Sequence, residues 1–133
     1  MKTLKGVIAG LSLMLAVAFS VSAQTNLTSL DGSRVNVEGQ AGKVVVMAIG
    51  ASWLPLSEKQ AEFTNALAKK YAGRNVVFYF VATDSLNPKS KNFAANDTIQ
   101  RFSAENKLTA TVLRDSDGAA TFKKFNIEQV ASF

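Results

Sequence analysis

The sequence predicts an α/β fold in which a central, mostly parallel sheet is flanked by helices. Two nearly continuous apolar runs, at residues 43–49 and 76–82, suit strands that are buried on both faces, as in a parallel sheet. The segments that follow them repeat apolar residues every three to four positions, which is typical of helices. An Asp-Gly pair at residues 31–32, between two short alternating segments, predicts an N-terminal hairpin. Strands that alternate with helices favour a parallel sheet.

The N-terminal segment, residues 1–23, has the three parts of a secretory signal peptide. It begins with Lys2 and Lys5, continues with an apolar run over residues 6–21, and ends on small side chains. The alternative is an uncleaved membrane anchor, but a spanning helix needs about 20 apolar residues and this shorter run is interrupted by glycine and serine. We therefore expect cleavage after residue 23, a periplasmic or secreted location, and a single domain over residues 24–133.

A helix is predicted over residues 57–72, directly after the first long strand. Pro55 suits the first turn of a helix, because the N–H that proline lacks has no partner there. Glu58 and Glu62 lie early and basic residues lie late, which complements the helix dipole, and Gly73 is a good stop. The two glutamates could also form a proton-transfer pair, but one helical turn apart on a first turn they are better interpreted as solvated dipole partners.

The remaining elements continue the alternation of strands and helices. A polar loop follows the strand at residues 76–82, and Asn96 or Asp97 is expected to cap a helix that runs to about residue 106. A third short strand is predicted over residues 109–115. After a turn, residues 119–125 are expected to form one or two helical turns.

The composition excludes several classes of function. The 133 residues contain no cysteine and no histidine. Thiol chemistry is therefore impossible within this chain, and so is a Ser-His-Asp triad. Asp115 and Asp117 resemble part of a calcium loop, but the 12-residue spacing and its terminal glutamate are absent, so we interpret the segment as a turn. We expect neither a metal site nor a cofactor.

The charge gives little support to nucleic-acid binding. The net charge is +5, and removal of residues 1–23 takes away two lysines and no acid, which leaves +3. The basic residues are spread along the chain, with lysine pairs at residues 69–70 and 123–124, and form no basic stripe interleaved with aromatic residues. After cleavage of the signal, we expect neither a nucleic-acid partner nor a membrane.

The stretch GKVVVMAIGASWLPLSEKQAEF, residues 42–63, passes from a strand through a short turn into a helix, and LTATVLRDSDGAATFKKFNIEQVASF closes the chain. In both segments the chain resembles the thioredoxin-like superfamily, and within it the redoxin group. That group contains the thiol:disulfide reductases of the bacterial envelope and the alkyl hydroperoxide reductase/thiol-specific antioxidant proteins. The resemblance covers about residues 27–133 and implies a thioredoxin-like fold.

Three departures from the family pattern bear on function. The two active-site cysteines of the family fall on Leu54 and Ser57, and its cis-proline falls on Ala131. A cis peptide bond before a residue other than proline costs about 2.5–4 kcal/mol, so we expect a trans bond at Ala131. The family's C-terminal strand pair and closing helix have no counterpart before Phe133. By the resemblance, one of those strands would pair with residues 43–49, so we expect an open sheet edge there, with either low thermal stability or self-association through that edge.

The resemblance places a degenerate redox motif at Trp53, Leu54, Pro55, Leu56 and Ser57. Trp53, Leu54 and Leu56 are expected either to form an exposed apolar surface for a client or to fill the space around the start of the helix. Ser57 has no histidine or other evident base to activate it, so we interpret it as a helix cap and not as a nucleophile.

These observations favour a secreted or periplasmic thioredoxin-like domain that lacks the redox cysteines and binds a protein or peptide client without catalysis. One alternative is a thiol-disulfide oxidoreductase or antioxidant by ancestry, because the family is one of oxidoreductases. The other alternative is a truncated, non-functional fragment. With no cysteine and no histidine, thiol redox activity is not expected.

Overall fold

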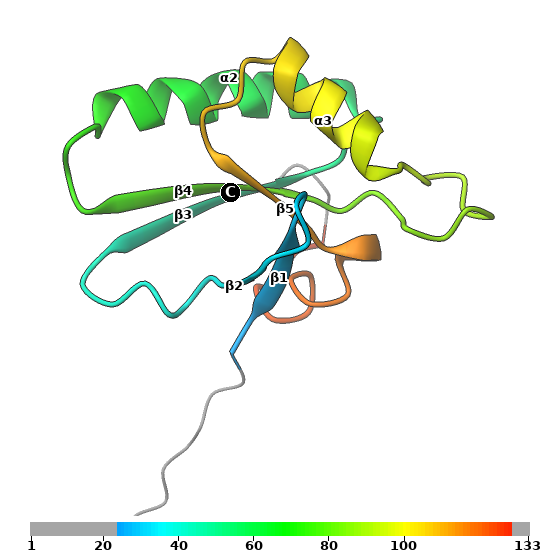
Figure 1. Cartoon of the computed structure of the whole chain (residues 1–133), viewed down its shortest axis with the longest axis horizontal. Helices are drawn as coiled ribbons and strands as arrows, with labels where there is room; N and C mark the ends of the chain where they lie inside the picture. Colours follow the sequence, from blue (N-terminus) through cyan, green and yellow to red (C-terminus); the bar gives the residue numbers. More distant parts are fainter. Residues whose placement is uncertain (1–23, 129–133) are drawn as a thin grey trace, which may run out of the picture.

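A computed structural model describes residues 24–128 and shows one five-stranded mixed sheet (Figure 1). The strands are β1 (Asn26–Ser29), β2 (Arg34–Asn36), β3 (Val44–Gly50), β4 (Val76–Ala82) and β5 (Thr111–Arg114). Their order across the sheet is β2-β1-β5-β4-β3. β3, β4 and β5 run parallel, whereas β1 is antiparallel to both β2 and β5. The predicted α/β fold with a hairpin at its start is confirmed.

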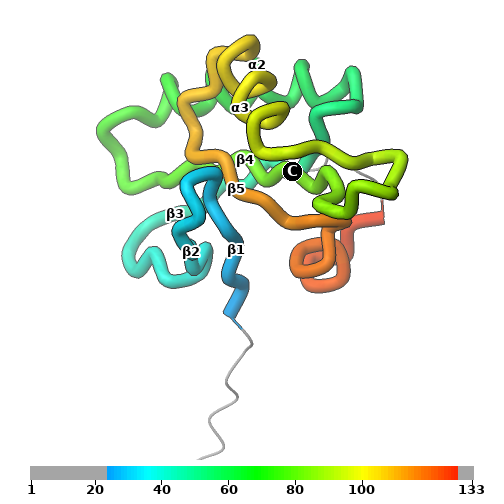
Figure 2. Tube along the Cα trace, turned by 45° about the vertical axis from the view of Figure 1, so that its right-hand side comes forward, coloured from blue at the N-terminus to red at the C-terminus, as the bar shows by residue number. Residues whose placement is uncertain are grey.

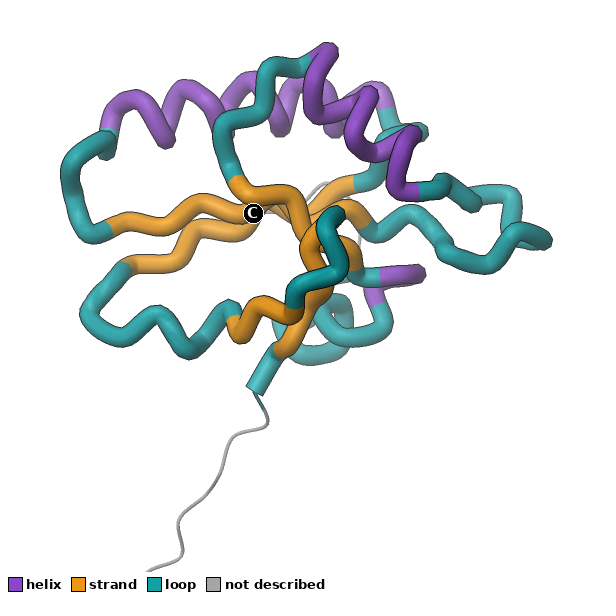
Figure 3. The backbone as a smooth tube through the Cα atoms, in the orientation of Figure 1, coloured by secondary structure: helices purple, strands orange, loops and turns teal. Residues whose placement is uncertain are grey.

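The two faces of the sheet are covered by different kinds of structure. The helices α2 (Pro55–Lys70) and α3 (Asn96–Glu105) lie over one face. The short 3₁₀ turn η2 (Ser116–Gly118) and the segment after it lie on the other side, as the two views in Figures 1 and 2 show. Figure 3 shows that this second cover consists mainly of loops and turns.

Each face of the sheet has its own hydrophobic cluster. Because side chains alternate along a strand, neighbouring residues of β3 and β4 contribute to different clusters. On the helix side, Ala48 and Phe80 pack with residues of α2 and α3, and the rings of Phe80 and Phe102 lie 5.6 Å apart. On the other side, Ile49 and Val81 pack with the hairpin and with the segment after η2.

Several predicted boundaries need correction. α2 begins at Pro55, two residues before the predicted start, and ends at Lys70; the place of Pro55 in the first turn is confirmed. α3 begins at Asn96 after Ala95, and no side chain caps it. The predicted cap, Asn96 or Asp97, was wrong because both residues lie inside the helix. The Oδ1 of Asn96 accepts a hydrogen bond from Arg114 Nη1 at 2.7 Å, and the Oδ1 of Asp97 accepts the amide of the next residue, Thr98, at 2.8 Å. Residues 119–125 form hydrogen-bonded turns where helical turns were expected.

The face that α2 turns to the sheet is largely polar. Its fully buried side chains are Ser57, Gln60, Ala61 and Thr64, which recur at helical spacing. Phe63 points away and is 54% exposed. Three buried polar side chains under one helix require hydrogen-bond partners, because burial without them is costly.

In the part of the chain that the structure describes, β3 is an edge strand that pairs only with β4. The amide of Val44 donates to the carbonyl of Asn75 at 2.9 Å, and the carbonyl of Gly50 accepts from the amide of Thr83 at 2.8 Å. In a parallel ladder, every second residue of a strand directs both its N–H and its C=O to the same neighbouring strand. These two bonds therefore show that the even-numbered residues of β3 bond to β4. The amides and carbonyls of Val45 and Met47 therefore face the open side, as expected from the sequence.

Within residues 24–128, no helix is long and apolar enough to cross a membrane. The predicted signal, residues 1–23, and the cis-proline position, Ala131, lie outside the described residues.

Candidate functional site

The degenerate motif lies at the carboxyl end of the parallel strands. After β3 the chain turns through Ala51 to Leu54 and begins α2 at Pro55. Trp53 is 49% exposed and Leu56 is 60% exposed, while Leu54 is half-buried. These exposures show that Trp53 and Leu56 do not simply fill the space beside the helix start.

Ser57, where the resemblance places the second cysteine, is fully buried. Its Oγ accepts a hydrogen bond from the amide of Ala51 at 3.0 Å. Ala51 belongs to the turn before α2, so the prediction that Ser57 caps the helix was wrong: its side chain supports the turn. Because the hydroxyl is buried and already bonded, it has no access to a substrate.

Gln60, one turn further along α2, holds the end of β3. Its Nε2 donates to the carbonyl of Ile49 at 3.1 Å. Together, Ser57 and Gln60 bond the amide of Ala51 and the carbonyl of Ile49, which both face away from β4. The fit around Gly50 is tight, because a Cβ there would lie 2.4 Å from Gln60 Oε1 and 2.7 Å from Ser57 Oγ. A larger residue at position 50 would displace both side chains.

Asp84 fixes the turn from the opposite side. This residue follows β4 and is fully buried. Its carboxylate accepts the amide of Ser52 at 3.0 and 3.2 Å and the hydroxyl of Ser52 at 2.5 Å. A buried carboxylate that receives three such bonds orients the turn that carries Trp53.

Arg114, at the end of β5, forms hydrogen bonds with both ends of the loop that follows β4. It is 5% exposed, and its Nη2 donates to the carbonyls of Asp84 at 3.1 Å and Ala94 at 2.8 Å. Burial lowers the pKa of the Arg114 guanidinium, and the negative charge of Asp84 acts in the opposite direction. Sequence reasoning missed both residues. The available signals were an aspartate two positions after one apolar strand and an arginine at the end of another.

The loop between β4 and α3 carries further exposed apolar side chains at the same end of the sheet. β3 and β4 are parallel, so this loop leaves the sheet from the same end as the motif. Within it, Leu86 is 51% exposed and Phe93 is 42% exposed. We call the exposed or half-buried apolar residues at this end the strand-end surface: Trp53, Leu54, Leu56, Leu86 and Phe93. The sequence pattern indicated only a polar loop, so Leu86 and Phe93 were not predicted.

The arrangement offers non-covalent binding and little reactive chemistry. The whole sequence has no cysteine, and the fully buried hydroxyl of Ser57 is bonded to the amide of Ala51. Glu58 is exposed, and the carboxylate of Glu62 lies 3.3 Å from Lys59 Nζ, also in solvent. Among residues 24–128, no group of three acidic, histidine or cysteine side chains could hold a metal ion. Asp115 and Asp117 lie in the turn η2 and its flank, as predicted.

Comparison of the sequence with known protein families assigns the chain to one of them. The profile of the Redoxin family matches residues 16–132, which is most of the chain. The chain belongs to the Redoxin family. This redoxin has Leu54 and Ser57 at the positions where the family resemblance calls for cysteines. No curated protein sequence matches it significantly.

Solved structures share the thioredoxin-like fold of this redoxin. It is similar to a secreted disulfide oxidoreductase of Mycobacterium tuberculosis homologous to E. coli DsbE, at 24% identity and a TM-score of 0.61, over 78% of this chain and 69% of that one. The dsbF protein of MTB gives 25% identity and a TM-score of 0.63, over 81% and 72%. A thioredoxin-like protein of Aeropyrum pernix gives 18% and 0.65, over 98% and 78%.

Proposed function

We propose that this redoxin is an exported domain that binds a protein or peptide client through the strand-end surface and does not exchange disulfides. The observation that carries the proposal is the pairing of two features at one turn. Neither motif position can supply a thiolate, because Leu54 and Ser57 occupy them. The apolar residues around the same turn are nevertheless held in solvent.

The surface has the character of a binding site. Soluble proteins rarely leave several large apolar side chains together in solvent unless they bind something. Here the polar contacts of Ser57 and Asp84 hold the backbone of Ala51 and Ser52, directly before Trp53, and leave Trp53 itself exposed. An exposed tryptophan on a backbone that is already ordered is a typical anchor for a partner, since that backbone need not be ordered on binding.

Export is supported by the sequence and by one relative. Residues 1–23 have the composition of a secretory signal, and a structural neighbour is described as secreted. Expression of the full chain in a bacterial host, followed by mass measurement of the periplasmic protein, should give a product that begins at Gln24. An intact N-terminus on the recovered protein would contradict the proposal.

A redox assay tests the absence of catalysis. The purified protein should neither reduce insulin disulfides nor consume peroxide with a thiol donor, because both reactions need a thiolate nucleophile. Turnover above the buffer control that persists after repurification would overturn this part of the proposal.

A binding assay tests the surface itself. Trp53 is the only tryptophan, so tryptophan fluorescence reports directly on this site. Titration with unfolded, alkylated polypeptides should change this fluorescence saturably, and Leu56→Asp or Leu86→Asp should weaken binding. The matched control is Phe125→Asp, which changes an exposed aromatic residue outside the strand-end surface. Equal loss in the control, or no saturable change with the native protein, would refute the assignment.

A further inference from the structure

A groove of about 740 Å³ lies between the start of β1 and the segment after η2, apart from the strand-end surface. Its lining includes three basic side chains, namely Arg34 from β2 together with Lys123 and Lys124. Ala119 and Ala120 supply small apolar side chains, and Thr25 supplies a polar one. The lining therefore joins several cations to a short apolar wall.

The segment that carries Lys123 and Lys124 is held in place by a buried aspartate. Asp115 is buried, and its carboxylate accepts the amides of Ala120 at 3.0 Å and Thr121 at 2.9 Å. The hydroxyl of Thr121 donates to the same carboxylate at 2.6 Å. Lys123 and Lys124 thus project from a backbone that is already ordered. A ligand that binds them would not have to order this turn.

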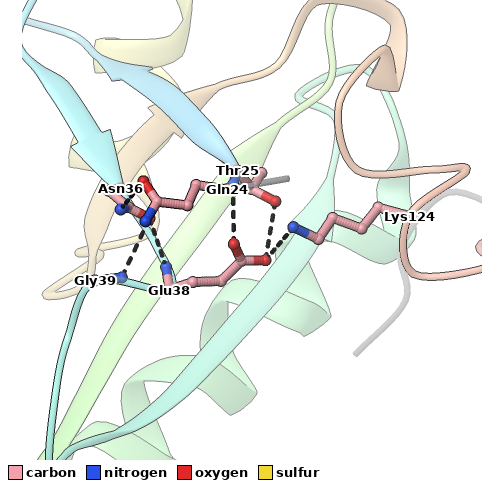
Figure 4. Close-up of polar contacts among 6 residues, drawn as sticks. All are labelled: Gln24, Thr25, Asn36, Glu38, Gly39 and Lys124. Carbon is pink, nitrogen blue, oxygen red and sulfur yellow. Dashed lines mark hydrogen bonds and ion pairs between the residues drawn. The ribbon is translucent and has the colours of Figure 1, made fainter. Parts of the chain in front are cut away.

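Glu38, the acidic residue beside the groove, already has hydrogen-bond and ion-pair partners. The carboxylate of Glu38 accepts the amide of Thr25 at 3.0 Å and the hydroxyl of Thr25 at 3.1 Å, and it pairs with Lys124 (Figure 4). The ammonium group of Lys124 is the main cause that lowers the pKa of Glu38, so this carboxylate stays ionised near neutral pH. The negative charge of Glu38 offsets the positive charge of Lys124 and does not offset the charges of Arg34 and Lys123.

The remaining charges favour an anion. Among the described residues, neither Arg34 nor Lys123 takes part in an ion pair. Even when Asp115 is counted with Glu38, the three cations exceed the acids by one. A guanidinium group binds two oxygens of one oxyanion with its planar fork, while an ammonium group acts as a point charge.

We propose that this groove binds a small dianion, such as a phosphate monoester or a dicarboxylate. Arg34 and Lys123 would contact its oxygens, and Ala119 and Ala120 would contact a short apolar part. Partial exposure limits the strength of each contact, and salt would screen it. The site is independent of the proposed client surface, and either could fail without the other.

The test uses the purified full chain and two probes, inorganic phosphate and succinate, at constant ionic strength. Either probe should shift the amide resonances of Ala119, Ala120 and Lys123 saturably. Arg34→Gln and Lys123→Gln should each weaken binding about fivefold, as expected for loss of one partly exposed charge contact. Lys89→Gln, an exposed lysine of the loop after β4, is the matched control and should change nothing.

The pattern across the two probes identifies the ligand class. Binding of phosphate alone would indicate a phosphate monoester, and equal binding of succinate would indicate a general dianion site. The proposal is overturned if neither probe saturates, or if Lys89→Gln weakens binding as much as the groove variants. Thermal melts of each variant ensure that a loss of binding reflects the lost charge and not unfolding.

Discussion

Asp84 lies 32 positions after Ser52 and accepts hydrogen bonds from both its amide and its hydroxyl. The two residues follow neighbouring parallel strands, so their contact joins the ends of β3 and β4. The carboxylate is fully buried, and Arg114 holds the backbone carbonyl of the same aspartate. This pair therefore connects the loop after β4 with the turn that bears Trp53.

Asp84→Asn should destabilise the protein by about 1.5–3 kcal/mol. The amide nitrogen of asparagine cannot accept the hydrogen bonds of Ser52, so a partly buried donor loses its charged acceptor. The measurement is urea unfolding followed by circular dichroism. The control is Glu105→Gln, an exposed acid, which should stay within about 0.5 kcal/mol of the native protein. Equal effects in the two variants would show that the buried contact contributes nothing.

The double variant Leu54→Cys/Ser57→Cys should form a disulfide at the start of α2 under mild oxidation. Position 54 is half-buried and position 57 is fully buried, so the single variant Leu54→Cys should react with a thiol reagent much faster than Ser57→Cys. Mass spectrometry after alkylation measures both. Two unpaired thiols in the oxidised double variant would contradict the placement of the motif.

Association through the edge of β3 can be tested with two prolines. Val45 has its amide on the open side, so Val45→Pro should reduce self-association and leave the bonds to β4 intact. Val46→Pro removes a donor to β4 and should lower the free energy of unfolding by about 1–3 kcal/mol. Sedimentation at several concentrations and thermal melts separate these effects. If association of the native protein persists unchanged in Val45→Pro, it uses another surface.

Stability should fall as the pH drops below about 4.5. Hydrogen bonds from Ser29 and Ser33 lower the pKa of Asp31 from 3.8 to about 2, and Lys124 lowers the pKa of Glu38 from its ordinary 4.5. A carboxylate whose pKa is lowered by folding stabilises the folded state fully above its unfolded pKa. That contribution is lost as the pH falls through the folded pKa. Melting temperatures measured against pH should decline less steeply for Glu38→Gln, whereas an unchanged slope would argue against the Glu38 contacts.

The sequence predicted the regular part of the fold well, because apolar periodicity records which faces are buried. The strand at residues 76–82 was predicted with its observed bounds, and the turn at Asp31 and Gly32 joins β1 and β2 as expected. The partners of buried polar side chains could not be predicted, since they come from distant segments. The cap assigned to Ser57 failed for a different reason: α2 begins at Pro55, so Ser57 lies inside the first turn, and its hydroxyl accepts the amide of Ala51 six positions earlier.

The apolar loop residues were missed for a related reason. Leu86 and Phe93 are isolated among polar residues, so no periodicity marks them. They join Trp53 and Leu56 at one end of the molecule only because β3 and β4 are parallel and neighbouring. The candidate site could thus be located from the motif, while its extent required the strand order.

The bond between Ser57 Oγ and the amide of Ala51 determines what a cysteine at position 57 would do to the turn. A sulfur atom accepts hydrogen bonds more weakly than oxygen, so a cysteine placed at position 57 alone would weaken the turn without adding a second thiol. Activity would need a second change at Leu54. A cysteine at position 57 would therefore carry a loss of stability, and the hydroxyl of Ser57 links the geometry of this turn to the absence of sulfur.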